Sequence, residues 1–236
     1  MMKLCDLHTH VLPGVDDGAA TMEYALQMLR NAVASDVEQL AVTPHWMGDG
    51  DPMDLQLRFL QLQQSARELP LRLVPGAEVR MCDGLLQTLP HRKLPTINGS
   101  RYLLTEFSPD TQSDAFIQAL QQILDAGYIP LVAHPERYYA ISQNPQQVMT
   151  WLDMGCHLQL TGGSILGAYG KTVQRTAEFL LSRDLIACVA SDAHGVDRRS
   201  NYLLDVYDHL AVWYSKQYAR CLMYENPMGI CNDNDL

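Results

Sequence analysis

The sequence is poor in basic residues. Its 236 residues include 17 lysine and arginine residues against 27 aspartate and glutamate residues, which gives a formal net charge of -10 at pH 7. A general nucleic-acid-binding surface needs a basic patch, so this composition argues against nucleic acid as a partner. A small pocket with a locally positive potential remains compatible with it.

Long apolar stretches are also absent. The opening residues, Met1-Met2-Lys3, lead directly into a strand-like run without an apolar segment of the signal-peptide type. No run reaches the about 18 consecutive apolar residues that a membrane-spanning helix requires. We therefore expect a cytoplasmic protein without stable membrane insertion.

Cysteine motifs are missing as well. None of the six cysteines forms a C-x-x-C pair, which argues against a zinc knuckle or a redox pair. Cys5 and Cys188 lie within apolar runs. Buried free thiols in a reducing compartment are therefore expected rather than disulfides.

The sequence does contain alternating strand-like and helix-like segments. Short apolar or β-branched runs, seven in all, occur at residues 3–7, 39–43, 71–77, 102–105, 129–133, 157–161 and 185–190. Helix-like segments at residues 22–35, 55–69, 114–126, 146–154 and 172–182 separate most of them. Residues 201–218 are predicted to form one further helix, and residues 84–99 are less regular.

This alternation predicts the fold class. Strands that alternate with helices form a parallel sheet with right-handed crossovers. Seven units favour a barrel over an open sheet, so we expect an α/β barrel with residues 1–236 as a single domain. In barrels of this kind the functional site lies at the carboxyl ends of the strands.

Histidines and carboxylates gather at those carboxyl ends. Five histidines and four carboxylates lie at or just beyond the ends of predicted strands: His8, His10, His45, His134, His194, Asp17, Glu78, Glu106 and Asp192. Imidazole suits zinc and iron, carboxylate suits manganese and magnesium, and mixed sets suit several of these ions. The pattern therefore predicts a cluster of divalent metal ions. His91, His157 and His209 lack this placement and are interpreted as surface or packing residues.

Each piece of the pattern also has a purely structural interpretation. Alternation points His8 and His10 to one side of the first strand, yet both could be simple loop residues. Asp16 and Asp17 could form a solvated turn or cap the helix near Met22. Two carboxylates at successive strand ends, however, repel each other unless cations lie between them. The combination therefore favours metal binding.

Three continuous motifs carry a resemblance to a known family. They are Asp6-Leu7-His8-Thr9-His10-Val11-Leu12-Pro13 with Asp16-Asp17-Gly18, Ala133-His134-Pro135-Glu136-Arg137-Tyr138, and Ala190-Ser191-Asp192-Ala193-His194. They resemble the PHP superfamily, named for polymerase and histidinol phosphatase proteins, and within it the bacterial capsule-type protein-tyrosine phosphatases. The resemblance runs from about Lys3 to Ile230 and includes a sixth-strand loop at residues 160–164.

The resemblance implies a distorted seven-stranded parallel (β/α)7 TIM-like barrel, the PHP fold, with three divalent metal ions. Manganese is the first expectation, and iron or zinc are the alternatives. By match to the family's motifs, one ion would be held by His8, His10, Glu78 and Asp192, a second by Glu78, Glu106 and His134, and a third by Asp17, His45 and His194.

Two arginines match positions that contact phosphate in the family. They are Arg137 and Arg199, with the adjacent Arg198 as the alternative to Arg199. From the residues alone, Arg137 could instead pair with Glu136, and Arg199 could be a solvated loop charge.

The implied activity is hydrolysis of a phosphate monoester by a metal-bound hydroxide. Three divalent ions outweigh the charge of four carboxylates, so the site would attract a phosphate dianion in an acidic protein. A phenolate leaves readily, because its conjugate acid has a pKa of about 10. The implied substrate is phosphotyrosine in a protein tail, such as that of a bacterial polysaccharide-export tyrosine kinase.

Other hydrolytic chemistries are disfavoured by the sequence. A thiol-based phosphatase needs an arginine six positions after its cysteine, and no cysteine here has one. The sixth residues after the first five cysteines are Val11, Thr88, Gly162, His194 and Pro227. A lysine-bridged metal pair is also disfavoured, because none of the four lysines ends a predicted strand.

The substrate is left open by the sequence. The stretch after His45, Trp46-Met47-Gly48-Asp49, departs from relatives that often carry basic or histidine residues there. A small-molecule phosphatase of the histidinol-phosphate type, or a phosphoesterase or nuclease, is therefore the alternative. A non-catalytic metal-binding module is a third possibility, weakened by the presence of all nine candidate ligands.

Overall fold

The computed structural model of the chain describes residues 3–48, 52–87, 89, 93–197 and 199–236. Of the residues named above, six lie outside the described residues: Met1, Met2, Asp49, Thr88, His91 and Arg198. All nine candidate metal ligands and both Arg137 and Arg199 lie within them.

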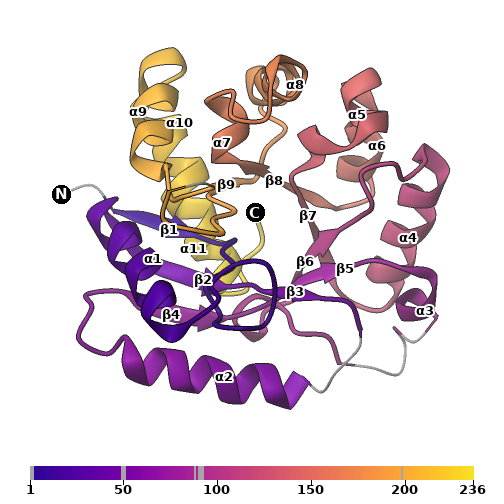
Figure 1. Cartoon of the computed structure of the whole chain (residues 1–236). Helices are drawn as coiled ribbons and strands as arrows, with labels where there is room; N and C mark the ends of the chain where they lie inside the picture. Colours follow the sequence, from indigo (N-terminus) through magenta and orange to yellow (C-terminus); the bar gives the residue numbers. More distant parts are fainter. Residues whose placement is uncertain (1–2, 49–51, 88, 90–92, 198) are drawn as a thin grey trace.

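Parallel strands alternate with helices, as the sequence predicts (Figure 1). In the described part of the chain, the strands form a three-stranded sheet, β1-β2-β4, and a six-stranded sheet, β3-β5-β6-β7-β8-β9. Their bounds are β1 (Leu4–Asp6), β2 (Val37–Val42), β3 (His45–Trp46), β4 (Arg72–Pro75), β5 (Glu78–Arg80), β6 (Tyr102–Glu106), β7 (Ile129–Ala133), β8 (His157–Thr161) and β9 (Cys188–Ala190).

Each of the seven predicted runs overlaps a strand, and two short strands were not predicted. The additional strands, β3 and β5, follow β2 and β4 after interruptions of two residues each. They pair with each other, with His45 opposite Glu78. The single closed barrel of seven strands stays a prediction, because the ladders divide between two sheets.

Backbone hydrogen bonds beyond the strand ends join the two sheets. An isolated parallel bridge pairs Thr9 with Ala193. The His10 N–H donates to the Ala193 carbonyl at 2.9 Å, and the Asp192 N–H donates to the His8 carbonyl at 2.9 Å. The segments that carry the predicted ligands after β1 and β9 are therefore held side by side.

Helices form an outer ring around the strands (Figure 1). Their bounds are α1 (Met22–Ala34), α2 (Pro52–Ser65), α3 (Asp83–Leu86), α4 (Ser113–Asp125), α5 (Tyr139–Gln143), α6 (Val148–Asp153), α7 (Gly162–Ile165), α8 (Lys171–Ser182), α9 (Leu203–Trp213), α10 (Lys216–Arg220) and α11 (Asn226–Cys231). The prediction of one helix over residues 201–218 is wrong. The chain breaks between α9 and α10, where the Ser215 side chain accepts a hydrogen bond from the Tyr218 N–H and starts a new helix.

The helices bury one face each against the strands. In α4 the buried residues are Phe116, Ala119, Leu120 and Ile123, the spacing of one helical stripe. Gly127 and Gly155 follow α4 and α6 with φ of 86° and 95°, which confirms their predicted role at helix ends.

Two expectations from composition can be compared with the structure. Within the described ranges, no helix is both long enough and apolar enough to cross a bilayer. All six cysteines are free, and Cys5, Cys156, Cys188 and Cys231 are buried, so the prediction of buried free thiols holds for these four.

Candidate metal centre

The nine predicted ligands meet at the carboxyl ends of the strands. They come from the segments after β1, β7 and β9, from the loop before α1, and from β3, β5 and β6. Seven of them are buried or nearly so, whereas the side chains of Asp17 and His45 are 64% and 28% exposed. The sequence prediction that these side chains lie close together is therefore confirmed.

Glu78 is the centre of the cluster. Its carboxylate is 1% exposed, and its Oε2 lies 3.3 Å from His8 Nε2, 3.4 Å from His10 Nε2 and 2.9 Å from His45 Nδ1. Its Oε1 lies 2.9 Å from His134 Nε2. One buried carboxylate thus faces four imidazoles.

Two further carboxylates extend the cluster on either side of Glu78. The Oδ1 atom of Asp192 lies 3.6 Å from the Nε2 atoms of both His8 and His10. Glu106 Oε2 lies 3.6 Å from His45 Nδ1, and Glu106 Oε1 lies 4.0 Å from His134 Nε2.

Asp17 forms the outer part of the cluster. Its Oδ1 lies 3.3 Å from His194 Nε2 and 3.6 Å from His45 Nε2. His45 therefore faces Asp17 with one ring nitrogen and Glu78 with the other. Among the residues that the structure describes, three overlapping groups have ligand atoms within 4.8 Å of one another: His10, Asp17, His45 and His194; His8, His10 and Glu78; and His45, Glu78 and Glu106.

Several polar atoms in this cluster are buried without a hydrogen-bond partner. They are Glu78 Oε2, Glu106 Oε2, His45 Nδ1, His134 Nδ1 and His194 Nε2. Glu78 Oε2 and His45 Nδ1 are close, yet they are not aligned as donor and acceptor. Buried polar atoms normally have partners, so converging oxygen and nitrogen atoms without them fit divalent cations.

Hydrogen bonds on the far side of the rings orient three imidazoles. The Nδ1 atoms of His8, His10 and His194 lie 2.8–3.0 Å from Gln159 Oε1, Asp16 Oδ2 and the Asp192 carbonyl, respectively. These oxygens only accept, so each Nδ1 carries a hydrogen and each Nε2 faces the cluster. Such outer contacts fix the ring that binds a metal.

Asp16 and Gln159 are functional residues that sequence reasoning missed. Asp16 also accepts hydrogen bonds from the His45 and Gly18 N–H groups at 2.9 and 3.0 Å. The interpretation of Asp16 as a helix cap is wrong, because Thr21 caps α1. Gln159 is fully buried at the middle of β8, where polar residues alternate with leucines, so its contact with His8 has no local signal in the sequence.

Positive φ angles occur at three predicted site residues. His134, Asp192 and Arg199 have φ of 37°, 53° and 50°. Sparsely populated backbone conformations cost about 1–3 kcal/mol and gather at functional sites. Here the backbone is held by neighbours, since the His134 N–H donates to Gln159 and the Arg199 carbonyl accepts from His194.

Arg137 and Arg199 converge on one carboxylate. Arg137 Nη1 lies 2.7 Å from Asp192 Oδ2, and Arg199 Nη2 lies 2.9 Å from both Asp192 oxygens. The alternative pairing of Arg137 with Glu136 is wrong as a direct contact. Glu136 is buried and accepts hydrogen bonds from the Thr161 N–H and Ser164 Oγ.

Burial and neighbouring charges shift the pKa values of three histidines in the cluster. Burial opposes a charge on His10, but its hydrogen bonds to Asp16 and Glu78 outweigh burial and raise its pKa to about 10. Burial likewise opposes a charge on His8, and the Glu78 and Asp192 carboxylates raise its pKa. Burial and the nearby His10 lower the pKa of His194 to about 3.

Gly18 allows the loop after β1 to approach His10. A Cβ atom at Gly18 would lie 1.9 Å from the His10 carbonyl oxygen and 2.5 Å from His10 Cβ. Any larger residue must displace this loop, which carries both Asp16 and Asp17.

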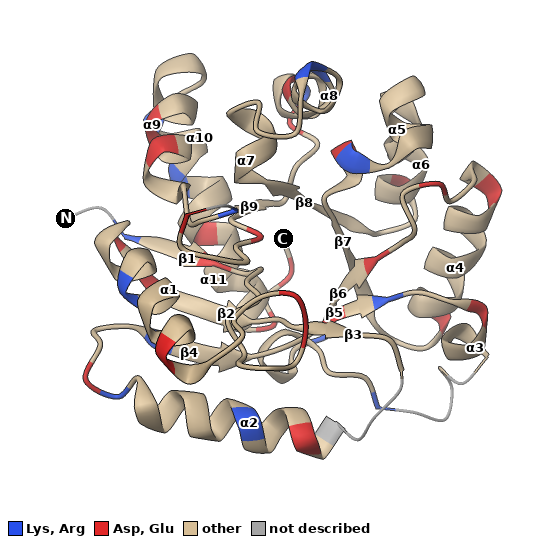
Figure 2. Cartoon of the chain, in the orientation of Figure 1, with Lys and Arg blue, Asp and Glu red and all other residues tan. Residues whose placement is uncertain are grey.

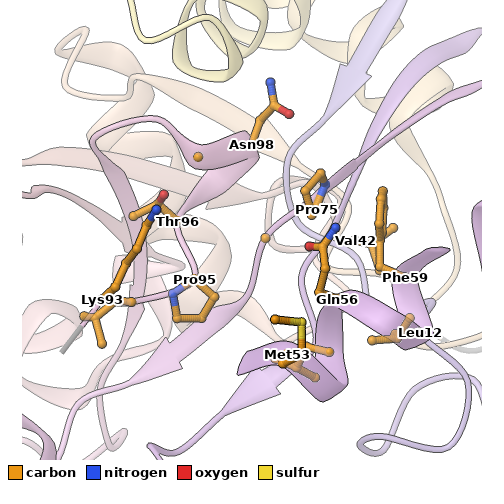
Figure 3. Close-up of a pocket in the computed structure, with 14 residues that line it drawn as sticks. Leu12, Val42, Met53, Gln56, Phe59, Pro75, Lys93, Pro95, Thr96 and Asn98 are labelled. Atoms are coloured by element: carbon orange, nitrogen blue, oxygen red, sulfur yellow. The ribbon is translucent and has the colours of Figure 1, made fainter. Parts of the chain in front are cut away.

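The mostly apolar hollow in Figure 3 is separate from this chemistry. It has a volume of about 490 Å³ and lies between α2 and residues 93–99. None of the described residues that line it is a histidine, aspartate or glutamate, and Lys93 is the charged one among them. It therefore offers no metal ligands of the kinds found in the cluster.

A family model and curated relatives match almost the whole chain. The model described as "Capsular polysaccharide synthesis, CpsB/CapC" matches residues 4–232. Tyrosine-protein phosphatase CpsB of Streptococcus pneumoniae is 32% identical over 240 residues, covering 98% of this chain and 99% of that protein. Tyrosine-protein phosphatase YwqE of Bacillus subtilis (strain 168) is 33% identical over 202 residues, covering 84% of this chain and 80% of that protein.

Solved structures give the same result. A chain from the crystal structures of YwqE and CpsB, described as metal-dependent tyrosine phosphatases, superposes with a TM-score of 0.91 and 30% identity. It covers 99% of this chain and 96% of that chain. A phosphotriesterase homology protein from Escherichia coli, with a TM-score of 0.61, 12% identity and coverage of 95% and 96%, shares the fold alone.

Cation binding should release protons. With a pKa of about 10, the His10 ring is protonated at pH 7 until a cation binds at its Nε2, and the raised pKa of His8 shifts that ring in the same direction. Falling pH should therefore weaken binding. Calorimetry with Mn²⁺ at pH 7, in two buffers of different ionisation enthalpy, should report release of about one proton or more. Equal heats in both buffers, with an affinity that does not change with pH, would contradict this charge assignment.

Replacement of Gly18 by alanine should weaken cation binding. The added methyl group displaces the loop that orients His10 and carries Asp17, and such outer contacts are worth about 10- to 100-fold in metal affinity. Metal content and Mn²⁺ titration of Gly18→Ala provide the measurement. Gly84→Ala is the matched control, because a Cβ there meets nothing within 4 Å. Normal affinity in Gly18→Ala would show that the loop does not position the ligands.

Proposed function

The chain belongs to the capsular polysaccharide synthesis CpsB/CapC family, and on that premise we propose that it is a metal-dependent protein-tyrosine phosphatase. The observation that carries the proposal is the cluster of five imidazoles and four carboxylates with the buried Glu78 at its centre. Relatives that align with nearly all of the chain bear the name tyrosine-protein phosphatase. The reaction would be hydrolysis of the phosphate monoester of phosphotyrosine.

We propose three divalent ions, with manganese first and iron or zinc as alternatives. The proposed ligands are the nine clustered side chains, in the three sets that the resemblance implies, with Glu78 shared between two of them. The unpartnered oxygen and nitrogen atoms of Glu78, Glu106, His45 and His194 support this assignment. When bound, such ions lower the pKa of a coordinated water and polarise phosphoryl oxygens.

Exposure indicates the side from which a phosphate approaches. His8, His10 and Glu78 are buried at the floor of the cluster. Asp17, His45 and the two arginines are partly exposed and form its rim. A phosphoryl group would therefore enter past the rim and lie between the arginines and the buried ligands.

Arg137 and Arg199 would bind and orient the phosphate. Arg137 donates to Asp192 through Nη1, and Arg199 does so through Nη2. The remaining N–H groups of each planar guanidinium can grip two phosphate oxygens. The shared contact with Asp192 keeps both positive charges beside the proposed ligand cluster.

The proposed substrate is a phosphotyrosine-bearing protein segment, specifically the tail of a bacterial tyrosine kinase of polysaccharide export. The capsule-synthesis family and the names of the relatives support it. Basic residues are scattered over many elements of the described chain (Figure 2), which gives no support to a nuclease groove. The cytoplasmic location stays a prediction.

The two sheets would act as one distorted barrel in a single domain. β2 with β3, and β4 with β5, are each separated by two residues and can be counted as one interrupted strand. With these pairs merged, seven strands follow one another around a ring that the Thr9–Ala193 bridge joins. This count supports the seven-stranded barrel that the resemblance implies.

Activity on phosphotyrosine peptides should require metal and no thiol. A chelator should abolish turnover and Mn²⁺ should restore it, whereas alkylation of the cysteines should leave it intact. His134→Ala should lose turnover because it removes a proposed ligand, and His209→Ala, which removes a ring stacked on Trp213, should keep it. Faster hydrolysis of histidinol phosphate or DNA than of the phosphotyrosine peptide would contradict the proposed substrate. Hydrolysis of none of the three would contradict the proposed enzymatic function.

Replacement of Arg137 or Arg199 by alanine should lower kcat/KM for a phosphate ester without lowering the metal content. Removal of a charged hydrogen bond to the anion costs roughly 1.5–3 kcal/mol, or about ten- to a hundredfold in kcat/KM. Arg137→Ala and Arg199→Ala should show this on aryl phosphates, and lysine should rescue only in part. Arg175→Ala, on the exposed side of α8, is the control. Full activity of both variants would show that the metal ions bind the phosphate without help from either arginine.

A further inference from the structure

Tyr169 is a candidate for a role that neither the sequence motifs nor the metal cluster assigns. It lies between α7 and α8 and is half-buried. The guanidinium carbon of Arg137 lies over its ring, 5.0 Å from the ring centroid. A cation at this distance is attracted by the electron density of the ring face.

The Tyr169 ring packs closely against Gly163. A Cβ atom added at Gly163 would lie 3.1 Å from Tyr169 Cε2, so the ring packs closely where Gly163 has no side chain. Gly163 itself is buried in α7, directly after β8. The ring is therefore supported by a rigid element and not by a free loop.

The charge of the second arginine also acts on Tyr169. Burial and the Asp192 charge raise the pKa of the Tyr169 phenol, while the charges of Arg199 and Arg137 lower it. Tyr169 thus lies under Arg137 and within the electrostatic influence of Arg199, the two arginines that converge on Asp192.

Arg137 needs such support if it is to bind a phosphate. Its Nη1 donates to Asp192, and in the described structure no other nitrogen of Arg137 has a hydrogen bond to the protein. A single hydrogen bond leaves the guanidinium free to rotate about that contact. A ring face beneath it fixes the plane and leaves the other N–H groups available.

We propose that Tyr169 is a positioning residue that holds the Arg137 guanidinium in the plane that receives a phosphate. The inference rests on the proposed phosphatase function, because it assigns Arg137 to phosphate binding. It adds that Tyr169 keeps the Arg137 guanidinium in its phosphate-binding orientation before the substrate binds.

The test uses the metal-loaded protein and inorganic phosphate as the probe, with binding measured by calorimetry. Tyr169→Leu removes the ring face and should weaken phosphate binding about three- to tenfold. Tyr169→Phe keeps the ring and should bind phosphate about as tightly as the parent. Tyr139→Leu, at an exposed tyrosine, is the control. Metal content and thermal stability are compared for every variant.

A double-mutant cycle with Arg137→Ala decides whether Tyr169 acts through that arginine. The effect of Tyr169→Leu should vanish in the Arg137→Ala background. Persistence of the full effect there, unchanged affinity in Tyr169→Leu alone, or an equal loss in Tyr169→Phe would each overturn the proposal. If Tyr169→Leu does not fold, Tyr169→Met replaces it with and without Arg137→Ala, because methionine also removes the ring face while it fills the space flexibly.

Turnover of phosphotyrosine peptide by the parent protein is measured separately. A parent that binds phosphate without hydrolysing the peptide would refute the proposed function. In that case the phosphate affinities of the Tyr169 variants would still test the role of Tyr169.

Discussion

The structure is organised around a carboxylate that water does not reach. Glu78 is 1% exposed and faces the rings of His8, His10, His45 and His134. An isolated buried charge is costly unless opposite charges surround it. Protonated imidazoles or divalent cations can supply that charge, and both use the same Nε2 positions of His8 and His10. The chemistry of the site follows from this exchange between protons and metal.

The strand interruptions bring Glu78 to this position. The chain leaves the three-stranded sheet after Pro75 and enters the six-stranded sheet at Glu78. Gly76 lies at this change of sheet, where a Cβ atom would crowd Thr43 Cγ2 at 3.1 Å. The same shift occurs between β2 and β3 and sets His45 opposite Glu78. Two irregularities of the sheet thus create the central contact of the site.

The sequence predicted the parts of the fold and site that depend on local pattern. Alternating strand and helix segments indicated parallel strands, and residue type at the strand ends identified the cluster. The two short strands were missed, because two or three residues carry no measurable periodicity. Long-range contacts were missed as well: the pairing of Arg137 with Asp192 spans 55 residues and has no local signal. The positive φ of His134 and Asp192 likewise depends on backbone partners from distant strands.

The overlap of the three ligand groups has a consequence for how the site tolerates change. His10, His45 and Glu78 each belong to two groups, so a change at any of these three disturbs two groups at once. Substitutions at residues that share partners do not combine additively. A second replacement among the partners of one of these residues should therefore cost less than it would alone. Tolerance to substitution would be lowest at the three shared residues and greater at the members that belong to one group.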